Sequence, residues 1–427
     1  MQALSYANYL ISIVFAVFYV YQVLYIPLVL LFRKKKDAKV IADRGEIVKH
    51  RYAVLICARN EEIVIGDLMN SIHNQTYPSD LIRIFVCADN CTDNTAAKAR
   101  ENGAEVFERF DTENIGKGYA LDYMLSKITE KYPGEFDGFF VFDADNILAK
   151  DYVERMNESF CDGHDIITSY RNSKNYGCNW ISAGIGLWFI RESVYLNNAR
   201  HILGISCAVS GTGFLFSKKI LEEDGGWPYH LLTEDIEFSA DHIVRGDKIA
   251  FCSGAMIFDE QPVKFRQSLS QQVRWCKGYL QLLRKYGWDL IKGFFTRGSF
   301  SCYDMLMNIA PAYLLSIASI ICNVSLFTVG LIQGNDPMIA LISIGQLLLN
   351  AFALFYAVGL ITTITEWKKI RTSTLKKLLF TFTFPVYMAT FVPLTFVALF
   401  AKISWKPIKH TMSVEKMSSE GQDTDFS

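Results

Sequence analysis

The chain carries almost no net charge. Its 43 lysine and arginine residues are balanced by 44 aspartate and glutamate residues, so the formal net charge is −1. A protein that binds nucleic acid through its phosphates needs a strongly basic face. The charge balance therefore gives no support for binding to nucleic acid. The hydrophobic fraction of 51% is high for a soluble protein and is concentrated toward the two ends.

Cysteine lacks any arrangement typical of a metal site. The ten cysteines are scattered, and no two have the spacing of a zinc motif. Cys87 and Cys91, the two that lie closest in sequence, belong to a pattern typical of a nucleotide-binding loop. We therefore expect reduced thiols in a domain that faces the cytosol.

The N-terminus lacks the basic residues of a secretory signal peptide. No Lys or Arg precedes the uncharged apolar run over 9–32, and this run is too long for such a peptide. Its length of about 24 residues suffices to cross a hydrocarbon core of roughly 30 Å. Basic residues follow at 33–36, and positive charge marks the cytoplasmic side. Residues 1–36 are therefore predicted to be a membrane helix with a basic flank and an outer N-terminus.

Short apolar runs alternate with amphipathic stretches over residues 50–145. Repeated strand–helix–strand units form parallel sheets that bind ligands at the carboxyl ends of their strands. Asp89 and Asp143-Ala144-Asp145 each lie just past a predicted strand, so a ligand site is expected there. The predicted strands are 52–57, 82–87, 105–107 and 138–142, and the predicted helices are 63–72, 95–102 and 118–132.

The composition changes again near residue 262. Over 262–304 basic residues alternate with Phe, Leu and Trp, which favours helices on the inner membrane face over a solvated charged helix. Membrane helices are predicted within 305–402, in the apolar segments 305–332, 338–365 and 378–401.

Charges between these segments predict their orientation. The turn at 334–337 has no basic residue and should lie outside, whereas the basic residues over 368–377 should lie inside. Pro385 and Pro393 could bend the last segment or make it re-enter, so its exit side stays open. The polar tail, 403–427, is expected to be disordered from Ser413 onward.

Three acidic motifs and one further motif follow one another in order. They are Asp89, Asp143-Ala144-Asp145, Thr233-Glu234-Asp235 and the string Gln-Gln-Val-Arg-Trp at 271–275. Over about residues 52–278 this set resembles membrane-bound family 2 glycosyltransferases, which include cellulose, chitin, hyaluronan and poly-N-acetylglucosamine synthases. The resemblance implies a GT-A-type α/β domain with a parallel-rich sheet over 37–261, joined to an α-helical transmembrane region.

The resemblance also assigns a nucleotide site. The loop with Arg59 and Glu61 would open the pocket, and Asp89 would accept a hydrogen bond from uracil. Asp89 alone is equally typical of an Asx turn or a helix N-cap. Lys117 lies at a predicted helix start, where backbone amides and its own charge favour phosphate.

The second motif implies a metal. The carboxylates of Asp143 and Asp145 would repel each other unless a cation lies between them. Mg²⁺ or Mn²⁺ could join them to the diphosphate of the donor. An isolated Asp-x-Asp is also common in turns, so the other motifs carry this prediction.

The remaining motifs imply the reaction and the acceptor site. Asp235 would be the base that takes the acceptor proton, with Glu234 orienting it, although Thr-Glu-Asp is also typical of a capped helix start. Arg274 would bind the donor diphosphate, and Gln271 and Gln272 would hydrogen-bond phosphate or sugar hydroxyls. Trp275, Gly211 and Thr212 would contact the acceptor. The stretch Gly-Thr-Gly at 211–213 departs from the usual family pattern.

Together these residues predict inverting transfer of a hexose or N-acetylhexosamine from UDP-glucose or UDP-N-acetylglucosamine. The expected product is a β-linked polysaccharide, elongated at the cytoplasmic face of the plasma membrane among its lipids and passed outward through the helices. The alternative is one transfer to a membrane lipid. A non-catalytic export subunit is disfavoured because all the acidic motifs are intact, and a transporter because the apolar segments lack charged midplane residues.

Overall fold

The computed structural model describes residues 2–43, 45–334, 337–403, 408, 410–419, 424 and 426. An eight-stranded mixed sheet has the strand order β3-β2-β1-β4-β7-β6-β8-β5. Its strands are β1 (Tyr52–Ala58), β2 (Ile82–Asp89), β3 (Glu105–Arg109), β4 (Gly138–Asp143), β5 (Ile147–Leu148), β6 (Ile166–Ser173), β7 (Phe214–Ser217) and β8 (Ile249–Asp259).

The half of the sheet that comes first in the sequence is parallel. Strand β1 pairs with β2 and β4, and β2 pairs with β3, all in parallel. These strands are apolar runs because helices cover both faces. The carboxyl ends of β2 and β4 therefore lie at one edge, where they place Asp89 and Asp143. Every strand and helix predicted between 52 and 142 is present, with ends shifted by two residues or fewer.

The other half of the sheet is mixed. Strand β7 is antiparallel to both β4 and β6, β6 is parallel to β8, and β5 is antiparallel to β8. Strand β7 lies beyond the residues for which the sequence predicts parallel strands, and its antiparallel pairing makes this parallel-rich sheet a mixed one. The helices of this α/β domain are α2 (Ile65–His73), α3 (Thr95–Glu101), α4 (Lys117–Lys131), α5 (Tyr152–Cys161), α8 (Lys218–Asp224) and α9 (Glu234–Arg245), with a short 3₁₀ turn, η1 (Ser79–Leu81).

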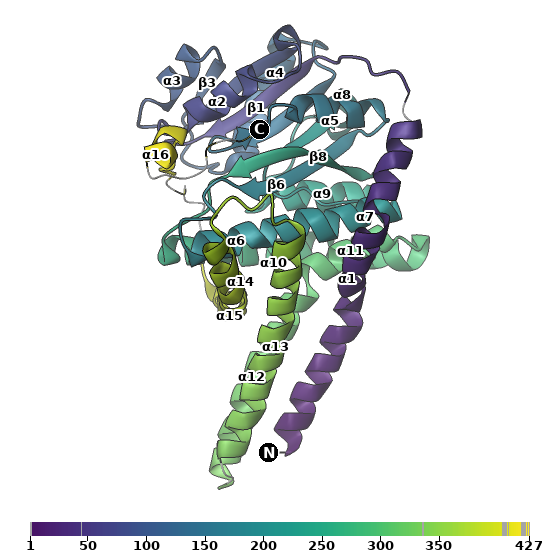
Figure 1. Cartoon of the computed structure of the whole chain (residues 1–427), viewed down its shortest axis with the longest axis vertical. Coiled ribbons are helices and arrows are strands. Elements are labelled where there is room, and N and C mark those ends of the chain that lie inside the picture. The colour runs from purple at the N-terminus through teal and green to yellow at the C-terminus, as the bar shows by residue number, and fades with distance from the viewer. Residues whose placement is uncertain are drawn as a thin grey trace.

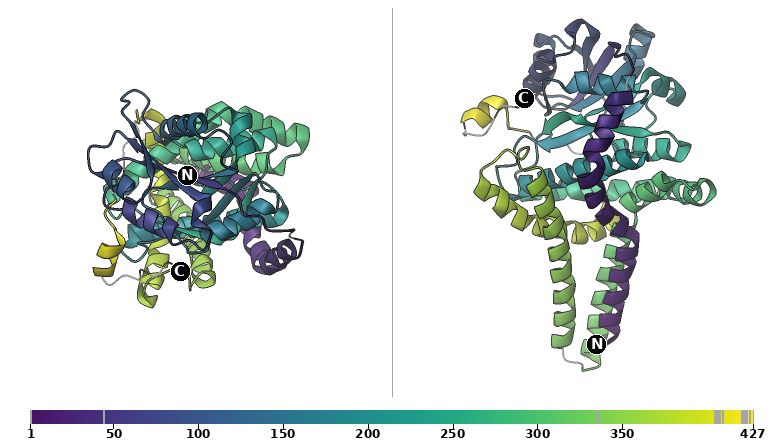
Figure 2. Two further views of the ribbon diagram at one scale, coloured as in Figure 1. Left: turned by 90° about the horizontal axis from the view of Figure 1, so that it is seen from above. Right: turned by 45° about the vertical axis from the view of Figure 1, so that its right-hand side comes forward.

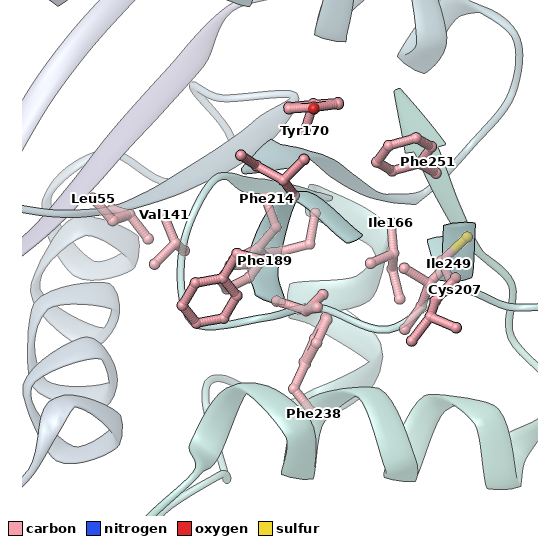
Figure 3. Packing of buried hydrophobic residues seen from close by; sticks show 14 of the residues in the cluster. Leu55, Val141, Ile166, Tyr170, Phe189, Cys207, Phe214, Phe238, Ile249 and Phe251 are labelled. Atoms are coloured by element: carbon pink, nitrogen blue, oxygen red, sulfur yellow. The ribbon is translucent and has the colours of Figure 1, made fainter. Parts of the chain in front are cut away.

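Alternate strand residues fill a separate core on each face of the sheet. Val54 packs in the core that includes Leu68 of α2, whereas Leu55 packs in the core that includes Leu121 of α4. The second core continues away from the sheet into helices that connect it to the membrane region. Figure 3 shows part of this core, with strand residues such as Phe214 close to Phe238 of α9.

A layer of helices lies between the sheet and the long apolar helices (Figure 1). Because this layer touches both parts, its packing fixes how the α/β domain sits on the membrane region. Its members are α6 (Trp180–Arg191), a π-helical segment η2 (Glu192–Asn197), α7 (Asn198–Leu203), α10 (Phe265–Arg297), α11 (Phe300–Ile309), α14 (Thr374–Ala389) and α15 (Phe391–Phe400).

Three long helices extend away from this layer: α1 (Gln2–Asp43), α12 (Pro311–Ile332) and α13 (Pro337–Thr365) (Figure 2). Near their far end Asn8 Nδ2 donates to Asn323 Oδ1 at 3.0 Å, which ties α1 to α12. The spans long and apolar enough to cross a membrane are Tyr6–Lys36, Ile344–Thr365 and Thr374–Phe400, and Ile317–Ile332 is a shorter apolar helix.

The apolar segment predicted over 305–332 is not one helix. Helix α11 ends at Ile309 and α12 begins at Pro311, because proline lacks a backbone N–H and suits the first helical position. The last segment also breaks, at Thr390, and α14 and α15 lie in the helix layer instead of alongside α12 and α13 (Figure 2). Asn335 and Asp336, in the turn predicted to lie outside, fall outside the described residues.

The prediction of disorder from Ser413 onward is wrong for the described part of the tail. Residues Val414–Ser419 form helix α16, and Met417 is fully buried against a small apolar cluster that includes Ile147 and Phe258. The Val414 amide donates to Asp67 Oδ2 at 2.8 Å. The composition of the tail does not predict this helix, because only a few apolar residues anchor a segment that is otherwise polar.

A buried ion pair joins the helix layer to the first membrane helix. Arg200 Nε of α7 lies 2.6 Å from Asp304 Oδ2 of α11, and both side chains are almost fully buried. Tyr25 of α1 donates to Asp304 Oδ1 at 3.3 Å. Buried charges are tolerated only when they are paired and hydrogen-bonded, so this set fixes where the three helices meet.

Gly184 of α6 allows Tyr387 of α14 to pack against the helix backbone. A Cβ at Gly184 would lie 2.4 Å from Cγ of Tyr387, whose side chain is fully buried. We predict that Gly184→Ala destabilises the protein by about 1–3 kcal/mol, because α14 must move away. Thermal unfolding of the detergent-solubilised protein measures this effect.

Gly345→Ala is the matched control. Gly345 also lies inside an apolar helix, and no atom lies within 4 Å of its Cβ position. Equal melting temperatures for the two variants would contradict the close packing of α6 on α14.

Candidate active site

One pocket lies beyond the carboxyl ends of β1, β2 and β4, between the sheet and α10. It brings together motif residues that are up to 216 positions apart, from Arg59 to Trp275. Every site residue predicted from the sequence lines it except Gln272 and Thr212: the lining includes Arg59, Glu61, Asp89, Lys117, Asp143, Asp145, Gly211, Glu234, Asp235, Gln271, Arg274 and Trp275.

Asp89 forms a buried end of this pocket. Its Oδ1 accepts hydrogen bonds from Arg109 Nη1 at 2.6 Å and from Asn90 Nδ2 at 3.0 Å. Both side chains of the Asp89–Arg109 ion pair are more than nine-tenths buried. Two donors on one oxygen hold the carboxylate in a single orientation, as recognition of a flat ring edge requires.

Lys117 links the second motif to the glycine loop. From the first turn of α4 its Nζ lies 2.5 Å from Asp143 Oδ1 and 2.6 Å from the Gly211 carbonyl oxygen. Burial opposes its charge, but Asp143 and Glu234 raise the pKa of Lys117 above its usual value. Lys117 therefore supplies a permanent positive charge at the centre of the pocket.

Asp145 is held more deeply than Asp143. Its Oδ2 accepts the Glu260 amide at 2.7 Å, whereas the Asp143 side chain is about one-third exposed. Burial opposes ionisation of Asp145, but His410 and Lys174 lower its pKa, so it stays a carboxylate. Asp145 thus remains negatively charged beside the pocket that Asp143 also lines.

The Asp143–Asp145 pair fits a divalent cation. Among the described residues, no cluster of three or more His, Cys, Asp and Glu side chains could enclose an ion by itself. Mg²⁺ sites commonly use one or two carboxylates and complete their coordination with substrate phosphate and water. The pair therefore suits an ion that binds together with a diphosphate.

Glu234 and Asp235 begin helix α9 at the other side of the pocket. Burial and the neighbouring Asp235 raise the pKa of Glu234 to about 8. Burial also raises the pKa of Asp235, although Lys117 and the Gly211 amide lower it. A carboxylate with a raised pKa is a stronger base, and this is the property that proton abstraction requires.

One face of α10 closes the pocket. Gln271, Arg274 and Trp275 lie at helical spacing and all line it. Burial lowers the pKa of Arg274, although the carboxylates of Glu234 and Asp235 oppose this change. Gln272 points elsewhere, because it is fully buried and its Oε1 accepts a hydrogen bond from Thr390 Oγ1 at 2.8 Å. Gln272, which the sequence predicts to hydrogen-bond phosphate or hydroxyls, therefore does not line the pocket.

Thr212 also lies outside the pocket lining. Its buried hydroxyl donates to Asn146 Oδ1 at 2.5 Å and accepts the Asp143 amide at 2.9 Å. The expectation that Thr212 contacts the acceptor is not met, since the side chain braces the turn that carries Asp143. Gly211 does line the pocket, and its positive φ of 80° suits glycine.

Two buried polar atoms of the motifs make no hydrogen bond within the part of the chain that the structure describes. They are Thr233 Oγ1 and Gln271 Oε1. Buried polar atoms are rarely left unpaired in folded proteins. Both residues line the pocket.

Several lining residues were missed from the sequence. His410, from the tail, has Nδ1 2.9 Å from both carboxylate oxygens of Glu61. Glu260 accepts the Thr411 amide at 2.9 Å. No sequence motif marks His410 or Glu260. Helix α6 adds two further lining residues, Trp188 and Phe189, and the apolar run at 180–191 is the only sequence signal that could have predicted this helix.

Comparisons with known proteins agree with this geometry. The family model described as "Glycosyltransferase like family 2" matches residues 50–278. A β-monoglucosyldiacylglycerol synthase from Synechocystis sp. is 24% identical over 253 residues, which cover 58% of this chain and 51% of that protein. A poly-β-1,6-N-acetyl-D-glucosamine synthase from Staphylococcus aureus is 27% identical over 240 residues, which cover 54% of each chain. The chain spans about half the length of the curated relatives it matches.

A solved structure supports the fold. The mannosyltransferase PcManGT from Pyrobaculum calidifontis, in complex with GDP-Man and Mn²⁺, has a TM-score of 0.53 and 15% identity, and the match covers 92% of this chain and 99% of that chain. At this identity the likeness shows the GT-A-type fold alone. The family model covers more than half of the sequence and all the motifs of the pocket. The chain is a membrane protein that belongs to glycosyltransferase family 2.

Proposed function

We propose that the protein transfers a hexose or N-acetylhexosamine from a UDP-sugar to a growing β-linked polysaccharide at the membrane surface. The observation that carries this proposal is the convergence of Asp143, Asp145, Asp235 and Arg274 on one pocket whose wall is the helix with Trp275. A non-catalytic subunit would have no use for a pocket that holds a base, positively charged side chains and a pair of carboxylates.

The chain's residues divide the reaction among them. Asp235 takes the proton from an acceptor hydroxyl, whose oxygen attacks C1 of the donor sugar while the bond from C1 to the diphosphate breaks. Inversion follows because attack and departure occur on opposite faces. Arg274 and Lys117 balance charge on the departing UDP. A divalent ion at Asp143 and Asp145 would supply further charge neutralisation there.

The glycolipid alternative has one specific observation in its favour. Both β-monoglucosyldiacylglycerol synthases and poly-β-1,6-N-acetyl-D-glucosamine synthases are among the relatives. Single transfer to a membrane lipid is therefore the second candidate. Export of a polymer through the helices stays a prediction.

We also propose that the α/β domain faces the cytoplasm of a cell whose plasma membrane holds the long helices. Basic residues gather where those helices reach the domain; for example, Lys369 Nζ lies 4.0 Å from the centre of the Tyr170 ring of β6. Positive charge marks the cytoplasmic side, so the far ends of α1, α12 and α13 are assigned to the outside.

Removal of divalent cations should abolish transfer. The Asp143–Asp145 pair offers few ligands of its own and suits an ion that binds with the diphosphate. UDP release from UDP-glucose and UDP-N-acetylglucosamine is measured before and after exhaustive chelation. We expect activity to return when Mg²⁺ or Mn²⁺ is added in excess; full activity in the chelated sample would rule out the metal.

Asp235→Asn should lower transfer by about 10²–10⁴-fold, since a positioned base contributes that much. UDP binding, measured by calorimetry, should stay within a few-fold because the amide keeps the shape of the carboxylate. Asp241→Asn is the control, on the same helix but outside the pocket lining. Lost UDP binding with residual turnover would instead make Asp235 a ligand contact.

Trp275→Ala should separate polymer synthesis from single transfer. An aromatic face can hold a sugar ring while the product slides after each addition, so its loss should shorten the polymer yet spare slow donor hydrolysis. Product length is measured with each radiolabelled donor, and Trp288→Ala, an exposed tryptophan of the same helix, is the control. A single lipid-soluble product from the unmodified protein would favour the glycolipid alternative.

A further inference from the structure

An aromatic wall lies opposite the nucleotide-binding end of the pocket. It is built by α6, η2 and α10, and none of its members except Trp275 belongs to a recognised motif. The wall residues are Trp188, Phe189, Glu192, Trp275 and Tyr279. Donor binding alone does not account for these residues.

The helix that carries this wall changes geometry at Glu192. Helix α6 ends at Arg191, and the chain continues as the π-helical segment η2. Trp188 and Glu192 are four residues apart, so they lie on the same side of the helix. Short π-helical segments occur frequently at functional sites, where the wider turn re-aims a side chain.

The aromatic rings are held by neighbours. The Arg171 guanidinium lies 3.6 Å from the centre of the Phe189 ring, and Phe189 meets Trp275 edge to face at 6.0 Å. The Arg191 guanidinium lies 5.0 Å from the centre of the Trp188 ring. Trp188 and Trp275 both stay partly exposed where they line the pocket. Such fixed, half-exposed rings suit the apolar face of a sugar.

Glu192 adds a carboxylate to this apolar wall. Its side chain is about nine-tenths buried, and its Oε2 accepts a hydrogen bond from Ser210 Oγ at 3.3 Å, which is long for an O–H donor. A carboxylate can accept several hydrogen bonds, so Glu192 has capacity for donors from a ligand. Burial raises the pKa of Glu192, while Arg200 and Arg171 oppose that change.

Glu192 lies close to the proposed base. Tyr279 lines the same pocket as Glu192 and Asp235. Ser210 contacts Glu192, and a Cβ on the next residue, Gly211, would lie 3.9 Å from Asp235 Oδ2. The two carboxylates thus both lie beside the short loop at 210–211, in the same pocket.

We propose that Glu192 and Trp188, together with Trp275, form the acceptor subsite and bind the terminal sugar ring of the acceptor. One ring hydroxyl donates to Glu192 while the neighbouring hydroxyl is presented to Asp235. This inference rests on the proposed function and deepens it, since it names the chemical class of the acceptor.

The subsite favours a glycosyl acceptor over diacylglycerol. Diacylglycerol has one free hydroxyl, and its hydrogen would go to Asp235, which leaves Glu192 with Ser210 and no donor from the ligand. A buried carboxylate that loses hydration and gains no donor is costly. A sugar ring supplies several hydroxyls, whether it ends a soluble saccharide or a glycolipid headgroup.

Binding of defined acceptors tests the proposal independently of turnover. Cellotetraose and chitotetraose are titrated into the full-length protein in lipid nanodiscs with UDP present, and tryptophan fluorescence reports binding. Glu192→Gln and Trp188→Ala should each weaken binding of at least one of these saccharides about tenfold or more, since a hydrogen bond to a charged group is typically worth that much. Glu223→Gln, an exposed change on α8, is the control.

Transfer assays distinguish the source of the sugar ring. Radiolabelled UDP-sugar is supplied with cellotetraose, with glucosyl-diacylglycerol or with dioleoylglycerol, and acceptor KM is compared between the unmodified protein and Glu192→Gln. We expect Glu192→Gln to raise the KM for one of the glycosyl acceptors and to leave UDP binding unchanged. Absence of UDP release from either donor would count against the proposed function and leave the binding result to decide the subsite.

Two results would overturn the subsite. The first is saccharide binding that Glu192→Gln and Trp188→Ala leave unchanged, or no saccharide binding at all to the unmodified protein. The second is efficient use of dioleoylglycerol with a KM that Glu192→Gln does not alter. A melting temperature equal to that of the unmodified protein confirms that each variant is folded, and Glu192→Asp should recover part of the affinity lost in Glu192→Gln.

Discussion

The pocket depends on how closely helix α10 approaches the turn that carries Asp235. Gly278 makes this approach possible, since a Cβ there would lie 2.5 Å from both Oγ1 and Cγ2 of Thr233. One helical face can therefore hold Arg274 and Trp275 against Glu234 and Asp235 without any intervening loop. The same helix packs on α15 and α11 in the layer below the sheet, so membrane-side packing and catalytic geometry are set by one element.

The second constraint on the site is that many charged side chains lie close together in it. Carboxylates from six separate segments line the pocket, and cations from other segments are placed among them. Lys117 contacts Asp143, Arg171 contacts Asp259, and His410 contacts Glu61. Buried ions are stable only with such partners. Lys117 and Arg274 add positive charge to the same pocket, which would balance the diphosphate of the proposed donor.

Local sequence specified the parallel half of the sheet and most of the pocket. Strand ends at Asp89 and Asp143 were predictable because buried parallel strands are uniformly apolar and ligand residues follow them. Antiparallel β7 was not, since pairing direction depends on partners far along the chain. Gln272 and Thr212 are next in sequence to residues that line the pocket, but their own side chains point away from it. Neighbouring side chains on a helix, as at Gln272, or in a glycine turn, as at Thr212, point in different directions. Trp188, Glu192 and His410 belong to no local pattern, so only the tertiary structure reveals them.

The contact between His410 and Glu61 has a consequence for biogenesis. The two residues are 349 positions apart, and the long apolar helices α12 and α13 lie between them in the chain. The end of the pocket that Glu61 lines therefore reaches its final form only after those helices have been synthesised and the tail that follows them has packed against the α/β domain. A nascent chain still waiting to enter the bilayer holds an incomplete pocket, which couples enzymatic competence to successful membrane insertion.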